Sequence, residues 1–411
     1  MPSIAVCDVP HRPTTHSDLL RSQQSGRYGN WQMSRGGELE TQEIATIIIP
    51  GRLDDDMTIS RREVFKYGIA AALTPSILHA AETDAVKDPY ADAVLVPNEP
   101  PALTPGAFTI AVLPDTQNYS EKFPETYLAQ TKWIVENQQS RNIASVLHLG
   151  DITNRNQPFE WDNAVRAMKL LDGKIPYFMV PGNHDYSDGG RCADRTTRLN
   201  EYFPVSQFQN LKTFGGVYDK EPDRLENSFH LFSAEGREFL VLALEFGPRK
   251  DVLRWANEVV GSHPTRSVIL ITHAYIYHND TRYDWKKYGG KQSWNPHSYL
   301  VAKETGDDVA DGEEIWNSLI SRHHNFILTL NGHVLADGLG RVRSATPDGR
   351  EIQQLLVNFQ MRPAGGDGWL RLLEFHPDGK TVQVYDYSPT RRERNMSAQN
   401  EFSFEISPPR A

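Results

Sequence analysis

The pattern of apolar and polar residues changes near residue 107. From there, short apolar runs alternate with segments in which apolar residues recur with the period of a helix. Strands separated by helices indicate βαβ units, and therefore a sheet with parallel strands. The helices are expected over 124–139, 158–171, 251–260 and 313–320. The runs that predict buried strands are 108–113, 145–149, 177–180, 267–271 and 325–330.

The later part of the chain also predicts antiparallel strands. Residues 229–232 and 238–244 flank the turn sequence Ala234-Glu235-Gly236, which predicts a hairpin. A polar insertion rich in aromatic residues occupies about 275–310. The chain is therefore expected to be an α/β protein whose folded domain spans 107–411. Its C-terminal strands are expected over 351–359, 369–375 and 381–387.

The residues before 107 lack this pattern. Residues 1–56 show no helical or strand period, and we expect them to be disordered or to be upstream sequence that is not part of the working protein. Residues 57–82 resemble a bacterial twin-arginine export signal, because Ser60-Arg61-Arg62 and Lys66 precede a moderately apolar stretch and small residues. Residues 83–106, rich in Pro, Asp and Ala, are expected to be a linker.

The export signal implies delivery by the twin-arginine export machinery to the periplasm or the outside of a bacterial cell. Met57 would then be the natural start of the chain. The alternative is a short amphipathic helix that happens to begin with Arg61-Arg62.

Composition limits the classes of function. The formal net charge is -10 over 411 residues, so general nucleic-acid binding, which favours basic surfaces, is not expected. The two cysteines, Cys7 and Cys192, are too few for a disulfide scaffold or a cysteine-rich zinc site. The sequence has no apolar run of roughly 18 residues or more, so no ordinary transmembrane span is expected.

Each predicted buried strand is followed by residues of the kinds that bind metal ions. Side chains at the carboxyl ends of neighbouring parallel strands converge at one edge of a sheet. The period of a strand also places Asp115 and Gln117 on the same side. The strand-end residues are Asp115 with Gln117, Asp151, Asn183 with His184, His273 and His333.

The order and spacing of these residues resemble the calcineurin-like metallophosphoesterase family, over about residues 107–340. The motifs of that family are Asp-x-His, Gly-Asp-x-x-Asp/Asn, Gly-Asn-His-Asp/Glu, His and Gly-His-x-His. The corresponding sequences here are Asp115-Thr116-Gln117, Gly150-Asp151-Ile152-Thr153-Asn154, Gly182-Asn183-His184-Asp185, His273 and Gly332-His333-Val334-Leu335.

The resemblance implies two packed mixed β-sheets flanked by helices, with two divalent metal ions at one edge. It implies that Asp151 bridges both ions. Oxygen and imidazole ligands of this kind suit Mn, Fe or Zn. The other implied ligands are Asp115 and Gln117 for the first ion, and Asn183, His273 and His333 for the second.

The implied activity is hydrolysis of a phosphate monoester or diester in a small phosphorylated substrate. Two metal ions about 3.5–4 Å apart lower the pKa of a bound water towards ~7, which supplies the hydroxide that attacks phosphorus. In this scheme His184 protonates the leaving oxygen or stabilises the charge on the equatorial oxygens, and Asn154 orients His184. The implied catalytic residues are therefore His184, Asp151 and Asn154.

Two residues depart from the family pattern. Gln117 stands where a histidine is usual, and Leu335 replaces the second histidine of Gly-His-x-His. Both changes fall on the first ion, so we expect one tight metal site and one weaker site that favours harder ions. Water, a substrate oxygen or an unplaced residue such as Asp337 could fill the vacated positions.

Other interpretations stay open at this point. Leu335 motivates a degenerate metal-binding protein of the same fold without catalysis, whereas the acidic charge disfavours a nuclease. We expect His148 to be a core histidine rather than a ligand. We expect Asp185 to cap a local turn or to support a ligand from behind, rather than to bind metal itself. The insertion at 275–310 either lines a substrate cleft or packs onto the core. This insertion and the loop at 362–369 are where we expect specificity.

Overall fold

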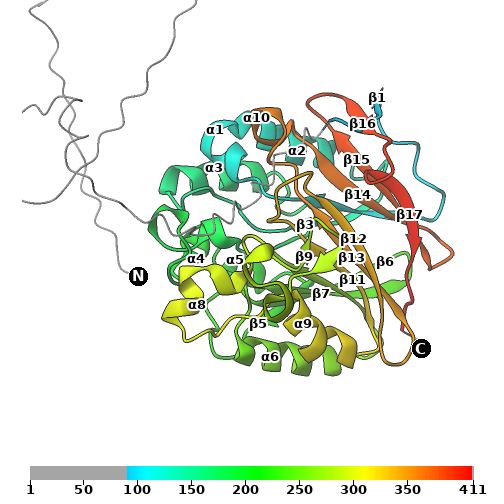
Figure 1. Cartoon of the computed structure of the whole chain (residues 1–411). Helices are drawn as coiled ribbons and strands as arrows, with labels where there is room; N and C mark the ends of the chain where they lie inside the picture. Colours follow the sequence, from blue (N-terminus) through cyan, green and yellow to red (C-terminus); the bar gives the residue numbers. More distant parts are fainter. Residues whose placement is uncertain (1–89, 410–411) are drawn as a thin grey trace, which may run out of the picture. The chain divides into compact units, whose positions relative to one another are not determined.

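The structure is a computed structural model that describes residues 90–409 (Figure 1). The predictions for residues 1–56 and 57–82 lie outside these residues, as does the first part of the expected linker. Within residues 90–409, no helix is long and apolar enough to cross a membrane.

The first of two large β-sheets is mixed. The described part of this sheet has eight strands in the order β1-β16-β15-β14-β2-β3-β4, with β17 paired to β15. Strands β2, β3 and β4 are parallel, and the other pairs are antiparallel. The bounds are β1 (Leu95–Pro97), β2 (Phe108–Leu113), β3 (Ile143–His148), β4 (Tyr177–Met179), β14 (Leu370–Phe375), β15 (Thr381–Ser388), β16 (Glu393–Asn395) and β17 (Glu401–Glu405).

The second sheet is also mixed. Its strands follow the order β12-β13-β11-β8-β7-β6-β5, and its centre, β13-β11-β8-β7, is parallel. A separate antiparallel ribbon joins β9 (Ile276–Tyr277) and β10 (Thr281–Arg282). The bounds are β5 (Phe214–Val217), β6 (Ser228–Ala234), β7 (Arg237–Leu244), β8 (Ser267–Thr272), β11 (Phe326–Asn331), β12 (Leu339–Ala345) and β13 (Glu351–Val357).

Helices connect and cover the strands. Both α2 and α3 begin with proline, which suits a first turn where backbone N–H groups have no intrahelical partner. The α-helices are α1 (Gln117–Lys122), α2 (Pro124–Glu136), α3 (Pro158–Met168), α4 (Leu199–Tyr202), α5 (Val205–Phe208), α6 (Lys250–Gly261), α7 (Trp285–Tyr288), α8 (Leu300–Glu304), α9 (Gly312–Ser318) and α10 (Pro363–Gly366). Short 3-10 turns are η1 (Asn183–Asp185), η2 (Asp188–Gly190), η3 (Gly289–Lys291), η4 (Pro296–Ser298) and η5 (Ile320–Arg322).

The strands pack in layers because their side chains alternate between two faces. Phe108 and Val112 of β2 pack with Ile269 of β8 in an apolar core between the sheets. The opposite face of β2, with Ala111, packs with Trp161 of α3. The outer face of the second sheet packs on α6 and α9. This helix–sheet–sheet–helix order (Figure 1) confirms the predicted fold of two packed mixed sheets flanked by helices.

Part of the expected linker at 83–106 belongs to the fold instead. Leu95–Pro97 forms β1, which pairs antiparallel with β16. Glu99 accepts hydrogen bonds from Trp133 Nε1 at 3.0 Å and from Arg141 at 3.2 Å. The proline content concealed this strand in the sequence, although an edge strand tolerates proline because it is paired on one side only.

The aromatic insertion at 275–310 packs onto the second sheet. Tyr275 and Tyr283 are fully buried, and both belong to the apolar core that covers this sheet's outer face. Trp294 is partly buried against the same core. Of the two interpretations left open, the structure therefore supports packing onto the core for these side chains.

A histidine ties this insertion to α9. His297 Nδ1 lies 2.6 Å from Asp307 Oδ1, and its Nε2 lies 2.8 Å from Glu314 Oε2. Both nitrogens face carboxylates, so the protonated ring is favoured. Burial lowers the pKa of His297, but hydrogen bonds and charge from Glu314 and Asp307 outweigh it and raise this pKa to about 9.

We expect His297→Gln to destabilise the protein more at about pH 6 than at about pH 10. The pKa of this ring is about 9 in the folded protein and ~6.5 in an unfolded chain. Its charge therefore stabilises the fold fully below ~6.5, and this contribution is lost as the pH rises through about 9. Denaturant unfolding of both proteins at the two pH values measures the effect.

His323 is the matched control, because burial lowers its pKa. Its protonation penalises the fold, so the destabilisation caused by His323→Gln should instead increase with pH. Equal destabilisation by His297→Gln at both pH values would contradict an ionic role for His297.

Candidate metal centre

The strand-end residues predicted from the sequence lie where the carboxyl ends of the two sheets meet. In each sheet the strands concerned are parallel neighbours, so their carboxyl ends lie side by side. The first sheet contributes Asp115 after β2, Asp151 after β3, and Asn183 with His184 in η1 after β4; the second contributes His273 after β8 and His333 after β11.

Two aspartates of the first sheet contact residues of both sheets. Asp115 Oδ1 accepts a hydrogen bond from the backbone N–H of His333 at 2.9 Å. Asp151 Oδ1 accepts one from the backbone N–H of His184 at 3.0 Å. Asp151 Oδ2 lies 3.1 Å from His273 Nε2, and Asp115 Oδ1 lies 4.0 Å from the same nitrogen. The two carboxylates therefore join the strand ends into one site.

The motif glycines are required because these side chains lie against the backbone. A Cβ atom on Gly332 would lie 2.0 Å from Asp115 Oδ2, and one on Gly182 would lie 2.1 Å from Asp151 Oδ1. Both distances are far below van der Waals contact, so any larger residue must displace a carboxylate.

The two histidines of the second sheet each keep one ring nitrogen available. His273 Nδ1 contacts the backbone oxygen of Leu149 at 2.7 Å, and His333 Nε2 contacts that of Trp294 at 2.8 Å. A carbonyl oxygen only accepts, so these nitrogens carry protons. His333 Nδ1 then holds a lone pair, whereas His273 Nε2, 3.1 Å from Asp151 Oδ2, offers one when a bound metal ion displaces its proton. Ligand atoms of Asp151, His273 and His333 all lie within 4.8 Å of one another.

The charges of the site favour the binding of a cation. Burial raises the pKa of Asp115 well above its usual range, and neighbouring Asp151 adds to this effect. Burial lowers the pKa of His273, but the charge of Asp151 outweighs it and raises this pKa to about 9. Two adjacent buried carboxylates thus favour a positive charge between them.

Unpartnered oxygen atoms show that a metal ion fits these residues. Asp115 Oδ2, Gln117 Oε1 and Asn183 Oδ1 are buried and accept no hydrogen bond from any residue within 90–409. Leaving a buried acceptor unpaired costs about 1–3 kcal/mol. These oxygens and the imidazole nitrogens are donors of the kinds that suit a divalent transition-metal ion.

His184 is oriented by the main chain of Asn154. His184 Nδ1 donates to the backbone oxygen of Asn154 at 2.8 Å. The side chain of Asn154 instead donates to Glu121 Oε2 at 2.8 Å. Asn154 therefore fixes the ring as predicted, but through a backbone atom and not through its amide.

His148 is a core histidine, as expected. It is fully buried; its Nε2 lies 2.9 Å from Thr116 Oγ1, and its Nδ1 accepts a hydrogen bond from Gly150 N at 3.2 Å. Burial lowers the pKa of His148 to about 3. Both nitrogens are therefore engaged in the neutral ring, and His148 supports the loop rather than the metal centre.

Asp185 links the loops after β3 and β4, which confirms the expected capping role. Its carboxylate accepts hydrogen bonds from the backbone N–H groups of Gly182, Ile152 and Thr153 at 2.8–3.0 Å. Asp337, considered above as a further ligand, accepts a hydrogen bond from Leu339 N within its own turn, at 3.2 Å, and from no other residue within 90–409.

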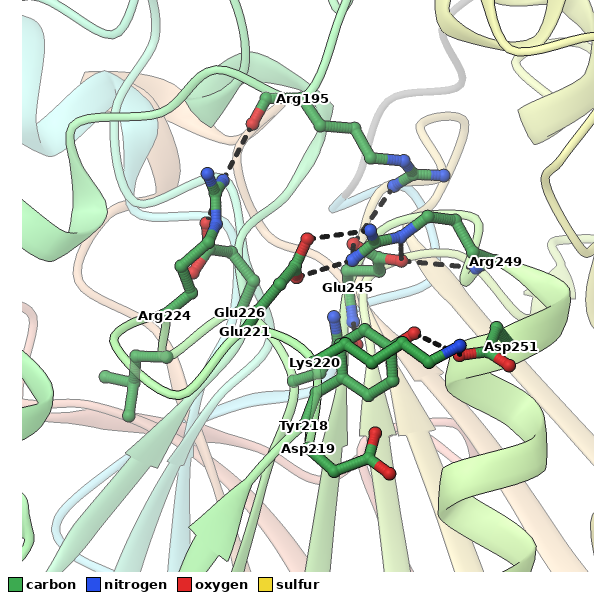
Figure 2. A network of polar contacts seen from close by, with 12 residues as sticks. Arg195, Tyr218, Asp219, Lys220, Glu221, Arg224, Glu226, Glu245, Arg249 and Asp251 are labelled. Carbon is green, nitrogen blue, oxygen red and sulfur yellow. Dashed lines mark hydrogen bonds and ion pairs between the residues drawn. The ribbon is translucent and has the colours of Figure 1, made fainter.

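An ion-pair network supports the segment after β7 (Figure 2). The buried carboxylate of Glu245 lies 3.3 Å from Arg195 and 2.8 Å from Arg249. The next residue, Phe246, places its ring 5.3 Å from that of His333, measured between centroids. The network thus holds an aromatic side chain against His333.

Two contacts of the site come from residues that the sequence analysis did not select. The backbone oxygen of Trp294 orients His333, and Gln360 Oε1 accepts a hydrogen bond from Gln117 Nε2. A main-chain carbonyl carries no residue-type signal, and Gln360 lies 243 residues from its partner. Neither contact could be found without the fold.

We expect Gly332→Ala to reduce metal binding, because the added methyl group would displace Asp115. Metal content after dialysis and manganese affinity by calorimetry measure the loss, which should be about 10-fold or more. Gly290→Ala is the matched control, since its Cβ would meet no atom of the described residues within 4 Å. Full manganese binding by Gly332→Ala would show that Asp115 is not a ligand.

The chain is similar to a known protein family and to individual known proteins. The family model described as calcineurin-like phosphoesterase matches residues 108–341. The chain is 30% identical to the protein YvnB of Bacillus subtilis (strain 168) over 321 residues, which are 76% of this chain. The chain spans only 22% of the length of that relative.

Two solved structures are similar in part. The purple acid phosphatase from yellow lupin (Lupinus luteus) seeds has a TM-score of 0.41 and 14% identity, covering 74% of this chain and 55% of that chain. The NAD nucleotidase of Haemophilus influenzae has a TM-score of 0.37 and 11% identity, covering 73% and 50%. Because the family model matches more than half of its residues, the chain belongs to the calcineurin-like phosphoesterase family.

Proposed function

We propose that this protein is a metal-dependent hydrolase of phosphate esters. The observation that carries the proposal is the buried cluster of Asp151, His273 and His333, whose ligand atoms lie within 4.8 Å of one another. Membership of a phosphoesterase family supports the same reaction class. We expect a small phosphorylated substrate, and the same metal core suits a monoester or a diester.

The donor set supports two adjacent divalent ions, with Mn, Fe or Zn as candidates. When bound, two such ions supply a nucleophile at neutral pH and stabilise charge on the phosphoryl group. The first position lacks imidazole and should be the weaker. We assign Asp115, Gln117 and Asp151 to the first ion, and Asp151, Asn183, His273 and His333 to the second.

His184 is the candidate for proton transfer. Its Nδ1 proton is held by Asn154 O at 2.8 Å, so Nε2 is the nitrogen left for the leaving oxygen. The ring is only partly buried, whereas the ligand histidines are buried. This position allows His184 to reach a substrate without binding the metal.

We expect His184→Ala to lower turnover by about 10²–10⁴-fold while metal content is kept, because it removes proton transfer alone. Asp151→Asn should lower both metal content and turnover. Purified protein is analysed for metal and assayed with manganese on a chromogenic phosphomonoester and the matching diester. His324→Ala, in the loop before β11 at the opposite end of that strand from the site, should change neither quantity.

Hydrolysis of neither ester, with metal content unchanged in Asp151→Asn, would reject the enzyme. It would favour the alternative motivated by Leu335, a protein of this fold without catalysis. Turnover unaffected by His184→Ala would remove His184 from the mechanism while leaving the metal centre in place.

We also propose export by the twin-arginine machinery, supported by Ser60-Arg61-Arg62 and Lys66 ahead of an apolar stretch. We expect Arg61-Arg62→Lys-Lys to leave uncleaved precursor in the cytoplasm, which fractionation and immunoblotting detect. Replacing Lys87, which lies outside this motif, with arginine controls for a general effect of basic residues. Unchanged delivery of the Lys-Lys variant would reject the assignment.

A further inference from the structure

The first metal position depends on an amide, and an amide has two unlike ends. Only the oxygen of Gln117 can bind a cation, because its NH₂ group donates and has no lone pair to offer. The two ends are similar in size, so packing alone does not select between them. Some neighbouring group must fix which end faces the site.

Gln360 is in position to make this selection. It follows β13, is 8% exposed, and its Oε1 accepts a hydrogen bond from Gln117 Nε2. With the NH₂ group turned to Gln360, Gln117 Oε1 is buried and accepts no hydrogen bond from the described residues. An unpaired buried acceptor two residues from Asp115 is the arrangement that a metal ligand requires.

The main chain of Gln360 is itself held in place. Its N–H donates to Asn358 Oδ1 at 2.9 Å, and its oxygen accepts from Asn118 Nδ2 at 3.4 Å. Asn118 follows Gln117 in α1, so the two glutamines are joined through backbone and side chain. The hydrogen bonds from Gln117 Nε2 to Gln360 Oε1 and from Asn118 Nδ2 to Gln360 O hold the loop after β13 close to the start of α1.

The rest of the loop is pressed onto the same helix. A Cβ atom on Gly365 would lie 2.6 Å from Asn118 Cβ, and one on Gly366 would lie 2.2 Å from Tyr119 Oη. Tyr119 Oη also accepts a hydrogen bond from Gly368 N at 3.0 Å. Gly365 and Gly366 have φ of +74° and +132°, backbone angles that residues with a side chain rarely adopt. The loop is therefore built for close contact with α1.

We propose that Gln360 is a positioning residue for the first metal ion, acting by fixing the amide of Gln117 with its oxygen towards the site. This inference rests on the proposed dinuclear centre. It explains how the chain retains a ligand at a position where its family carries histidine. Gln360 does not touch the metal, and its contribution is the orientation of Gln117.

The test titrates the full chain with Mn²⁺ alone and follows free Mn²⁺ by electron paramagnetic resonance. Gln360→Met keeps the size but removes the acceptor, and it should weaken the lower-affinity site about 10–100-fold with the tighter site unchanged. Gln360→Glu keeps an acceptor for Gln117 Nε2 and should retain both sites. Met361→Ala, in the same loop, is the control for general perturbation.

A double-mutant cycle separates orientation from loop structure. In a Gln117→Ala background, Gln360→Met should cause no further loss of manganese affinity. Equal weakening of both sites, equal loss in Gln360→Glu and Gln360→Met, or an additive cycle would overturn the inference.

The two proposals fail in different ways. Wild-type protein that binds one Mn²⁺ would reject the dinuclear centre. In that case Gln360 would keep its positioning role only if Gln117→Ala and Gln360→Met both weaken manganese binding at that single site. If either variant binds manganese as the wild type does, the role of Gln360 is rejected. Two wild-type sites that Gln360→Met leaves unchanged would reject Gln360 alone.

Discussion

The burial of two carboxylates where the sheets meet is the constraint on which the rest of this structure depends. Asp115 and Asp151 are each 1% exposed. Burying like charges together costs several kcal/mol per ion unless donors and cations compensate. Backbone N–H groups of His333 and His184 supply part of this compensation, and His273 supplies another part. A bound metal ion would supply the rest of the charge compensation that these two carboxylates need.

Holding these groups also requires an unusual backbone. Asp115, Asp151 and His333 have φ of 38°, 48° and 75°, a region that costs about 1–3 kcal/mol for residues other than glycine. All three follow a buried strand of the parallel core. The apolar packing between the sheets therefore fixes the strand ends firmly enough to keep the ligands in conformations that an isolated loop would leave.

The sequence predicted what depends on residue type and local period. Buried strands, the candidate ligands at their carboxyl ends and the core role of His148 all follow from such signals. The structure brings four of these candidates together, namely Asp115, Asp151, His273 and His333. Strand β1 was not predicted because an edge strand with proline lacks a clear alternation of apolar and polar residues. Two contacts were also not predicted: that of His333 with the backbone oxygen of Trp294, and that of Gln117 with Gln360. Contacts between segments distant in the sequence leave no local pattern.

The two proposed ion positions depend on different parts of the chain. On the second side, His333 is oriented by Trp294 of the insertion and packed by Phe246. On the first side, Gln117 depends on the loop after β13. A histidine ligand is oriented by one contact to its other ring nitrogen, whereas a glutamine needs a partner that distinguishes its oxygen from its nitrogen. With glutamine instead of histidine at position 117, the orientation of this side chain therefore depends on the loop after β13. Changes in that loop can alter the binding of the first ion without altering the binding of the second.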